Sequence, residues 1–140
     1  MTWTELEKNL SGQLYKLWNR LSSGSYYPPP VMQVEIAKKG GGVRKLGIPT
    51  LLDRIAQQVV RKRLEVMLEP KFHEHSYGYR PGRSAHDAVA QSQRNCFNHD
   101  FVLDLDIQSY FDTIDHELMM KALKHYGAEK WMLLYIGRWL

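Results

Sequence analysis

Apolar residues recur every three or four positions in two long stretches of the chain, and this spacing is typical of one face of a helix. The first stretch covers residues 3–21, and the second runs from about residue 51 to residue 68. Thr50 stands where a side chain caps the start of the second stretch, and Pro70 stands where a helix must end. The pattern therefore predicts two long amphipathic helices.

Three shorter helical patterns follow later in the chain. Ser84 and Asp87 have the spacing of a capping box, so we expect a helix to begin there and to extend to about residue 97. Asp115 is placed to cap a helix that ends at Gly127. The strongly apolar run 131–136 predicts a last helix, and a face of this kind needs a partner.

Two short β-type runs, residues 31–36 and 43–48, are separated by a segment with three consecutive glycines. Glycine adopts positive φ without strain, so this segment predicts an antiparallel hairpin with a mobile tip. Lys38 and Arg44 place positive charge near that tip. A basic hairpin tip is either a solvated turn or a clamp for an anion, and composition favours the turn.

Strict alternation over residues 101–108 predicts a third strand, with an apolar back and an acidic front. Asp104 and Asp106 lie on the same face of this strand, roughly 6.5–7 Å apart. By itself, a pair of acids at this spacing is more typical of a solvated strand face than of a metal site. The spacing nevertheless places the Asp106 carboxylate at the end of a buried strand, where a cation has access to it.

The length and composition of the chain fit one domain with a modest positive charge. The chain has 140 residues, of which 44% are hydrophobic, and its net charge is +4. This composition supports a single core and makes a polyanionic partner plausible, while no apolar run approaches the roughly 20 residues that span a bilayer. A single cysteine fits a reducing compartment, so we expect a cytoplasmic protein. The helical and strand patterns together predict an α+β fold that is mostly helical.

Three motifs in the same order resemble the reverse transcriptases encoded by group II introns. They are D-I-Q-S-Y-F-D from Asp106, V-E-I-x-K-x-G-G-G-V-R-K-L-G-I-P-T-L-L-D-R-I-A-Q-Q from residue 34, and S-Y-G-Y-R-P-G-R-S-A-H-D-A-V from residue 76. The resemblance implies a helical extension at residues 1–25, a fingers subdomain at 26–100 and the beginning of a palm at 101–140. It identifies the chain as an N-terminal part of an RNA-directed DNA polymerase.

The resemblance also implies roles for five residues in the complete enzyme. Asp106 and the carbonyl of Ile107 would bind the catalytic Mg²⁺ ions, which prefer oxygen ligands. The ring of Phe111 would pack under the incoming sugar. Lys38 and Arg44 would hold the triphosphate of the incoming nucleotide through charge-assisted contacts. The expected partners are an RNA template or intron RNA, a DNA primer and a deoxynucleoside triphosphate.

Three arginines are candidates for contact with RNA. Arg80 and Arg83 are interleaved with tyrosines on a glycine-rich loop, which suits template backbone and stacked bases. An equally good interpretation is that they bridge loop carbonyls to acidic residues of the palm. Arg20 lies on the polar side of the first helix, which touches template or intron RNA in the family. Arg54 is expected to order the base of the hairpin through Asp53 or a nearby carbonyl.

Several elements of a complete polymerase are absent from the 140 residues. The sequence has no Y-x-D-D and no P-Q-G segment, so we expect that this chain alone does not synthesise DNA. The alternatives are a non-catalytic RNA-binding module and a reverse transcriptase of retron or diversity-generating type. An unpaired palm strand and an apolar last helix also predict self-association through the exposed palm surface.

Overall fold

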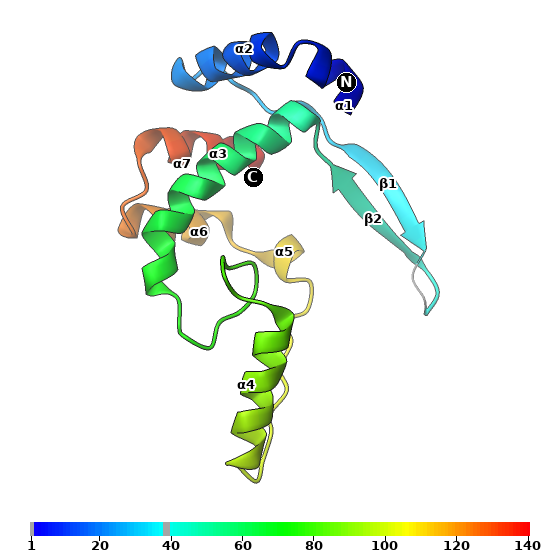
Figure 1. Ribbon diagram of the computed structural model, residues 1–140, viewed down its shortest axis with the longest axis vertical. Helices are drawn as coiled ribbons and strands as arrows, with labels where there is room; N and C mark the ends of the chain where they lie inside the picture. Colours follow the sequence, from blue (N-terminus) through cyan, green and yellow to red (C-terminus); the bar gives the residue numbers. More distant parts are fainter. Residues whose placement is uncertain (1, 38–39) are drawn as a thin grey trace.

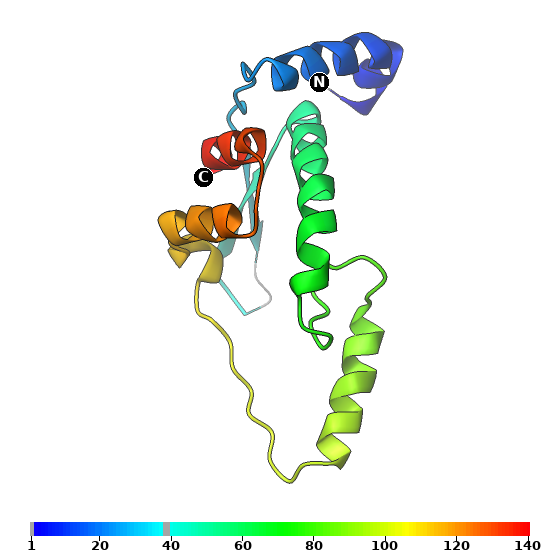
Figure 2. The same cartoon turned by 90° about the vertical axis from the view of Figure 1, so that its left-hand side faces the viewer.

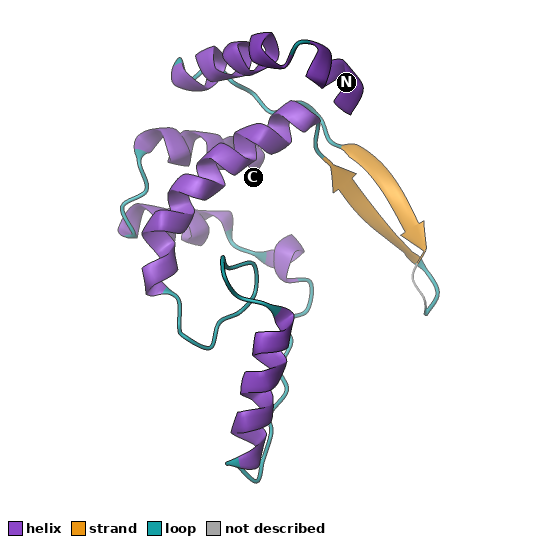
Figure 3. Cartoon of the chain, in the orientation of Figure 1, coloured by secondary structure: helices purple, strands orange, loops and turns teal. Residues whose placement is uncertain are grey.

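The computed structural model describes residues 2–37 and 40–140, and it combines helices with one two-stranded antiparallel hairpin (Figure 3). This mixed, mostly helical fold was predicted from the sequence. The elements in chain order are α1 (Trp3–Lys8), α2 (Leu10–Ser22), β1 (Met32–Ala37), β2 (Val43–Ile48), α3 (Leu51–Leu68), the 3₁₀ turn η1 (Glu69–Lys71), α4 (Ala85–Phe97), α5 (Tyr110–Thr113), α6 (His116–His125) and α7 (Lys130–Trp139).

Helix α3 is the axis on which the other elements are arranged. Figures 1 and 2 show α1 and α2 across its N-terminal end, α6 and α7 along one side, and α4 pointing away from its C-terminal end. The hairpin also leaves the N-terminal end of α3 (Figure 1). The core lies where α2, α3 and α7 meet, and its buried residues are Leu17, Tyr26, Ala56, Val60, Met132 and Tyr135.

The first predicted helix is divided in two. Its N-cap is Thr2, which forms a capping box with Glu5, and α1 ends at Asn9, where φ is −142° and ψ is 46°. Gly12 makes room for the Asn9 side chain, because a Cβ at Gly12 would lie 2.4 Å from the Asn9 Oδ1 atom. The apolar spacing continues across the break, which explains why periodicity alone predicted one helix.

The bounds of α3 agree with the prediction, and so does its cap. The Thr50 hydroxyl accepts a hydrogen bond from the backbone N–H of Asp53 at 3.3 Å. The same cap geometry starts α4, where Ser84 and Asp87 form the predicted capping box. The α6 helix likewise begins after Asp115, whose carboxylate accepts from the N–H of Leu118 at 2.9 Å.

A buried carboxylate joins three segments of the core. Asp53 is only 1% exposed, and its Oδ1 atom accepts hydrogen bonds from the Tyr26 hydroxyl at 2.6 Å and from the Trp139 indole N–H at 2.9 Å. Its Oδ2 atom accepts from the Gln57 amide at 2.9 Å. A buried carboxylate is costly unless donors surround it. These donors therefore fix the connector after α2 and the helix α7 against the start of α3.

Arg138 fastens the last helix to the same connector. Its Nη1 atom donates to the carbonyl oxygens of Gly24, at 2.8 Å, and of Tyr26. Its guanidinium carbon lies 3.9 Å from the centroid of the Tyr27 ring, which is a cation–π arrangement. The hydroxyl of Tyr135 donates to the carbonyl of Leu21 at 2.6 Å. The apolar last helix thus finds its partner inside the chain.

The hairpin forms at the predicted position. Its strands pair from Met32 opposite Ile48 to Ala37 opposite Val43. Gly41 and Gly42 have φ values of +89° and +85°, as expected for a turn that favours glycine. Most of its side chains are exposed on both faces, so the hairpin extends away from the core as a two-stranded arm.

The predicted palm strand is not formed. Residues 101–107 do not form a β-strand, and Figure 2 shows them as a single extended path between α4 and α5. Phe101 is 92% exposed and Leu105 is 80% exposed. A strand is stabilised by hydrogen bonds to a neighbouring strand, and none runs beside this segment in the described part of the chain. The sequence analysis expected an unpaired strand with a buried apolar face, but the unpaired segment forms no strand and its apolar side chains are exposed.

The Tyr26 hydroxyl is a direct test of the buried network. Tyr26→Phe is expected to lower the free energy of unfolding by about 1.5–3 kcal/mol, because it removes a donor to a buried carboxylate. Tyr27→Phe is the matched control, since Tyr27 is exposed and its ring remains available to Arg138. Urea unfolding followed by circular dichroism measures both. Equal stabilities for the two variants would contradict the role given to Asp53.

The same hydroxyl predicts a loss of stability in alkali. Burial and the hydrogen bond to Asp53 raise the pKa of Tyr26 above its usual value of 10. Above that pH the unfolded chain releases the Tyr26 proton while the folded chain retains it, so unfolding becomes more favourable. The wild type should lose up to roughly 1.4 kcal/mol per pH unit more than Tyr26→Phe does above pH 10. Parallel pH profiles of the two proteins would exclude this linkage.

Candidate active site and nucleic-acid interface

The predicted metal ligands lie in the extended segment 101–107. Asp106 and Ile107 are both exposed, and Asp104 is the nearest acid in the sequence. Mg²⁺ in proteins is held by several oxygen ligands in octahedral geometry. Within the described residues, no group of three or more His, Cys, Asp or Glu side chains is placed to hold a metal ion. One carboxylate and one carbonyl do not make a Mg²⁺ site without further ligands.

The predicted sugar-contacting ring is on the surface. Phe111 lies in the single-turn helix α5, directly after Ser109, whose φ of 51° is in the left-handed region. Its ring is 81% exposed and packs edge-to-face on Tyr110, with the centroids 5.3 Å apart. Asp106 and Phe111 are thus separated by one tight turn, and neither is covered by other described parts of the chain.

The predicted triphosphate clamp is only partly described. Arg44 is exposed on β2, opposite Ile36, near the tip of the hairpin. Lys38 lies outside the described residues. In the described part of the chain, no hydrogen bond or ion pair links Arg44 with Asp106. The structure therefore places the two predicted groups on separate elements, the hairpin and the segment before α5 (Figure 1).

Arg80 is an internal residue of its loop. Its Nε and Nη2 atoms donate to Glu69 Oε1 at 3.0 and 2.7 Å, and its Nη1 atom donates to the carbonyls of His73 and Ser76 at 2.7 and 2.8 Å. Its side chain is 8% exposed. These contacts correspond to the bridging alternative, but the acidic partner is Glu69 in η1 and not a palm residue.

Arg83 and Arg20 have their charges at the surface. The Arg83 guanidinium lies 5.3 Å from the centroid of the Tyr77 ring and remains exposed. The loop ends next to the Ser84–Asp87 capping box, where hydrogen bonds from Ser84 lower the pKa of the Asp87 carboxylate. Arg20 is exposed in the last turn of α2. Both arginines are available to a phosphate, and their contact with RNA stays a prediction.

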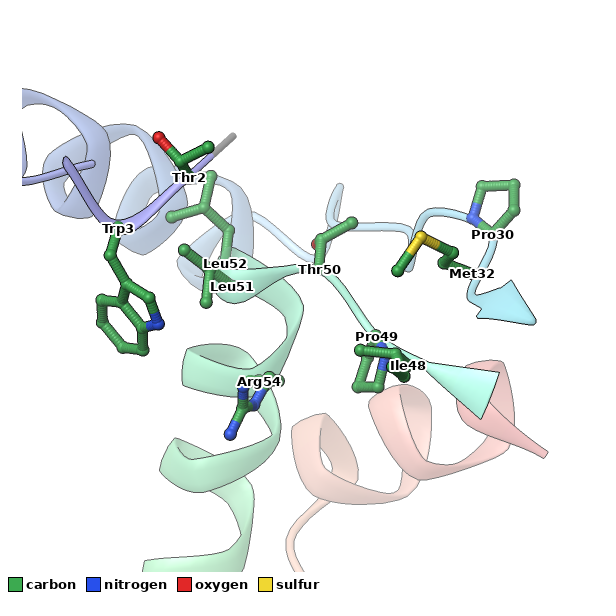
Figure 4. Close-up of a pocket in the computed structure, with 10 residues that line it drawn as sticks. All are labelled: Thr2, Trp3, Pro30, Met32, Ile48, Pro49, Thr50, Leu51, Leu52 and Arg54. Atoms are coloured by element: carbon green, nitrogen blue, oxygen red, sulfur yellow. The ribbon is translucent and has the colours of Figure 1, made fainter. Parts of the chain in front are cut away.

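A groove that the sequence did not predict lies where α1, the base of the hairpin and the start of α3 meet (Figure 4). Its volume is about 670 Å³. Arg54, which we expected to order the hairpin base, lines this groove, while its neighbour Asp53 faces the core. The lining residues are Thr2, Trp3, Pro30, Met32, Ile48, Pro49, Thr50, Leu51, Leu52 and Arg54.

A family model described as reverse transcriptase (RNA-dependent DNA polymerase) matches residues 36–140. The chain belongs to the reverse transcriptase family. The match begins at the end of β1 and includes Arg44, Asp106 and Phe111. In the described part of this reverse transcriptase chain, no helix is both long and apolar enough to cross a membrane.

The curated relatives of the reverse transcriptase chain include proteins from introns. Protein YkfC of Escherichia coli is 40% identical over 126 residues, which cover 86% of this chain and 33% of that protein. The group II intron-encoded protein LtrA of Lactococcus lactis is 41% identical over 105 residues, 74% of this chain and 18% of LtrA. The COX1/OXI3 intron 1 protein of Saccharomyces cerevisiae is 33% identical over 117 residues, 84% and 14% respectively.

These relatives confirm the predicted resemblance to group II intron reverse transcriptases, since LtrA is encoded by such an intron. The chain spans a third or less of the length of each of the three. Most of each relative therefore has no counterpart in these 140 residues.

The two loop arginines are expected to respond differently to substitution. Arg80→Gln should lower the free energy of unfolding by roughly 1–3 kcal/mol, because Glu69 and two carbonyls lose a largely buried partner. Arg83→Gln should change it by less than about 0.5 kcal/mol, as for exposed sites in general. Urea unfolding gives both values, and limited proteolysis reports opening of the loop. A destabilised Arg83→Gln with an unaffected Arg80→Gln would reverse the assignment.

Proposed function

We propose that this chain forms the fingers and the beginning of the palm of an RNA-directed DNA polymerase of the group II intron type. Residues 26–100 act as the fingers, residues 101–140 open the palm, and residues 1–25 are a helical extension. The observation that carries the proposal is the continuous family match over residues 36–140, which includes the second strand of the hairpin and the Asp106 segment in one alignment.

In the complete enzyme, Lys38 and Arg44 bind the triphosphate of the incoming nucleotide, and Phe111 packs against its sugar. Asp106 and the Ile107 carbonyl supply part of a Mg²⁺ site, and the remaining ligands come from outside these 140 residues. The exposure of Arg44, Asp106 and Phe111 supports this proposal, because side chains that bind a substrate must be accessible to it and not buried in the core. Mg²⁺ would supply charge neutralisation at the phosphates.

The exposed apolar side chains of segment 101–107 also support the proposal. Apolar and acidic side chains alternate along this segment, and the apolar ones are exposed. This is the pattern of a strand whose neighbouring strands are missing. Further palm strands would pair with this segment and would hold Asp106 in a fixed position. A second copy of the chain offers the same exposed pattern, which is the basis of the predicted self-association.

The RNA template is contacted by Arg83 on the loop before α4 and by Arg20 on α2. Both guanidinium groups are exposed, and the net charge of +4 favours a polyanion. Arg80 contributes indirectly by holding the shape of the loop that carries Arg83. The second candidate function is a non-catalytic RNA-binding module. It is favoured by one observation, namely that the cationic side chains of Arg20 and Arg83 are exposed at the surface.

Primer extension on an RNA template distinguishes catalysis from binding. The 140-residue chain is expected to give no extension product with Mg²⁺ and deoxynucleoside triphosphates, because Asp106 alone does not complete a two-metal site. It should bind single-stranded RNA with an affinity that falls steeply with salt, and Arg83→Gln should reduce the steepness by about 0.7 in the log–log slope.

Two results would contradict these expectations. DNA synthesis that disappears in Asp106→Ala would show that the chain is a working polymerase. Absence of RNA binding at low salt would remove the template role of Arg83 and Arg20. Asp104→Ala is the matched control for Asp106→Ala, because both acids are exposed in the same segment.

A further inference from the structure

The groove between α1, the hairpin base and α3 is apolar over most of its lining. Proline, methionine, isoleucine and leucine side chains form the walls, and Trp3 stands at one side (Figure 4). A volume of about 670 Å³ is in the range of pockets that bind small ligands. None of the buried core residues named above belongs to this lining, so the groove is a surface feature and not a packing defect of the core.

One charged side chain lines this apolar groove. Arg54 is exposed and forms no hydrogen bond or ion pair with the described part of the chain. Asp53 is next to it in sequence, but its two oxygens already accept from Tyr26, Gln57 and Trp139. A guanidinium without an acidic partner at the edge of an apolar surface is well suited to an anion.

Trp3 supplies a flat surface in the same groove as Arg54. Its indole is 61% exposed, although the residue belongs to α1 and lines the groove. Figure 4 shows the indole and the Arg54 side chain extending from α1 and α3, with Ile48 and Pro49 beyond Arg54. The ligand chemistry that matches these groups is a planar aromatic body linked to an anionic group. A nucleotide has both parts.

We infer that this groove binds one unpaired nucleotide, with its base stacked on Trp3 and its phosphate held by Arg54. The inference rests on the proposed function, because nucleic acid is the partner expected of a reverse transcriptase chain. Stacking on an exposed aromatic ring combined with a cation is how sequence-tolerant binding of single strands is achieved. The site therefore takes an unpaired base.

Matched tryptophan variants test the stacking contact. Trp3 is compared with Trp18, which is 60% exposed on α2 and does not line this groove. Binding of the 140-residue chain to a fluorescein-labelled RNA of about ten uridines is followed by fluorescence anisotropy. Trp3→Ala should weaken binding about 5- to 100-fold, whereas Trp3→Phe should stay within about threefold of the wild type. Trp18→Ala should leave the affinity unchanged.

Matched arginine variants test the phosphate contact. Arg54→Gln should weaken binding and lower the slope of log affinity against log salt by about 0.7, the value for one phosphate contact in a single strand. Arg94→Gln on α4 is the control, since Arg94 donates to Gln91 on its own helix and lies outside the groove. Competition with uridine monophosphate shows whether a free nucleotide suffices or whether the strand is required.

The outcomes separate the groove from the proposed function. Binding of the oligomer that is unchanged in Trp3→Ala, or equally weakened in Trp18→Ala, overturns the groove inference and leaves RNA binding intact. No binding by the wild type at low salt overturns both. Far-ultraviolet circular dichroism of Trp3→Ala and Trp3→Phe verifies that loss of affinity is not loss of folding, and the Arg54→Gln slope provides a reading that does not depend on Trp3.

Discussion

The carboxylate of Asp53 is the interaction on which the fold depends. Three donors, from the connector after α2, from α3 itself and from α7, converge on its two oxygens inside an apolar core. Removing any donor leaves charge uncompensated in a medium that solvates it poorly. The network therefore sets how the first and last helices sit against α3, while the surrounding apolar residues supply most of the stabilising burial.

Outside this core, the chain extends as two arms (Figures 1 and 2). The hairpin is one, and the other consists of α4 with its preceding loop and the path 101–107, which returns from the far end of α4 to α5; the side chains of both arms are largely exposed. Arg44, Asp106 and Arg83 are located on these arms, whereas Arg20 lies on α2. The core thus fixes where each arm begins.

Local rules predicted the parts of this fold that local forces decide. The caps at Thr50, Ser84 and Asp115 and the glycine turn of the hairpin depend on residues close in sequence, and all were correct. The break at Asn9 was missed because the apolar spacing continues through it. The strand at 101–108 was wrong because pairing requires a neighbour that alternation cannot supply. Asp53 and the groove around Arg54 depend on contacts between distant segments, so no single motif indicated them.

The contacts of Arg138 also determine when the core is completed. This residue, near the end of α7, donates to carbonyls of Gly24 and Tyr26, which are 114 and 112 positions earlier in the chain. Trp139 closes a similar span of 86 positions to Asp53. During synthesis, α2 and α3 emerge from the ribosome long before these donors exist. The apolar faces of the two helices that α7 covers therefore stay open until α7 arrives, so the core is completed late in synthesis.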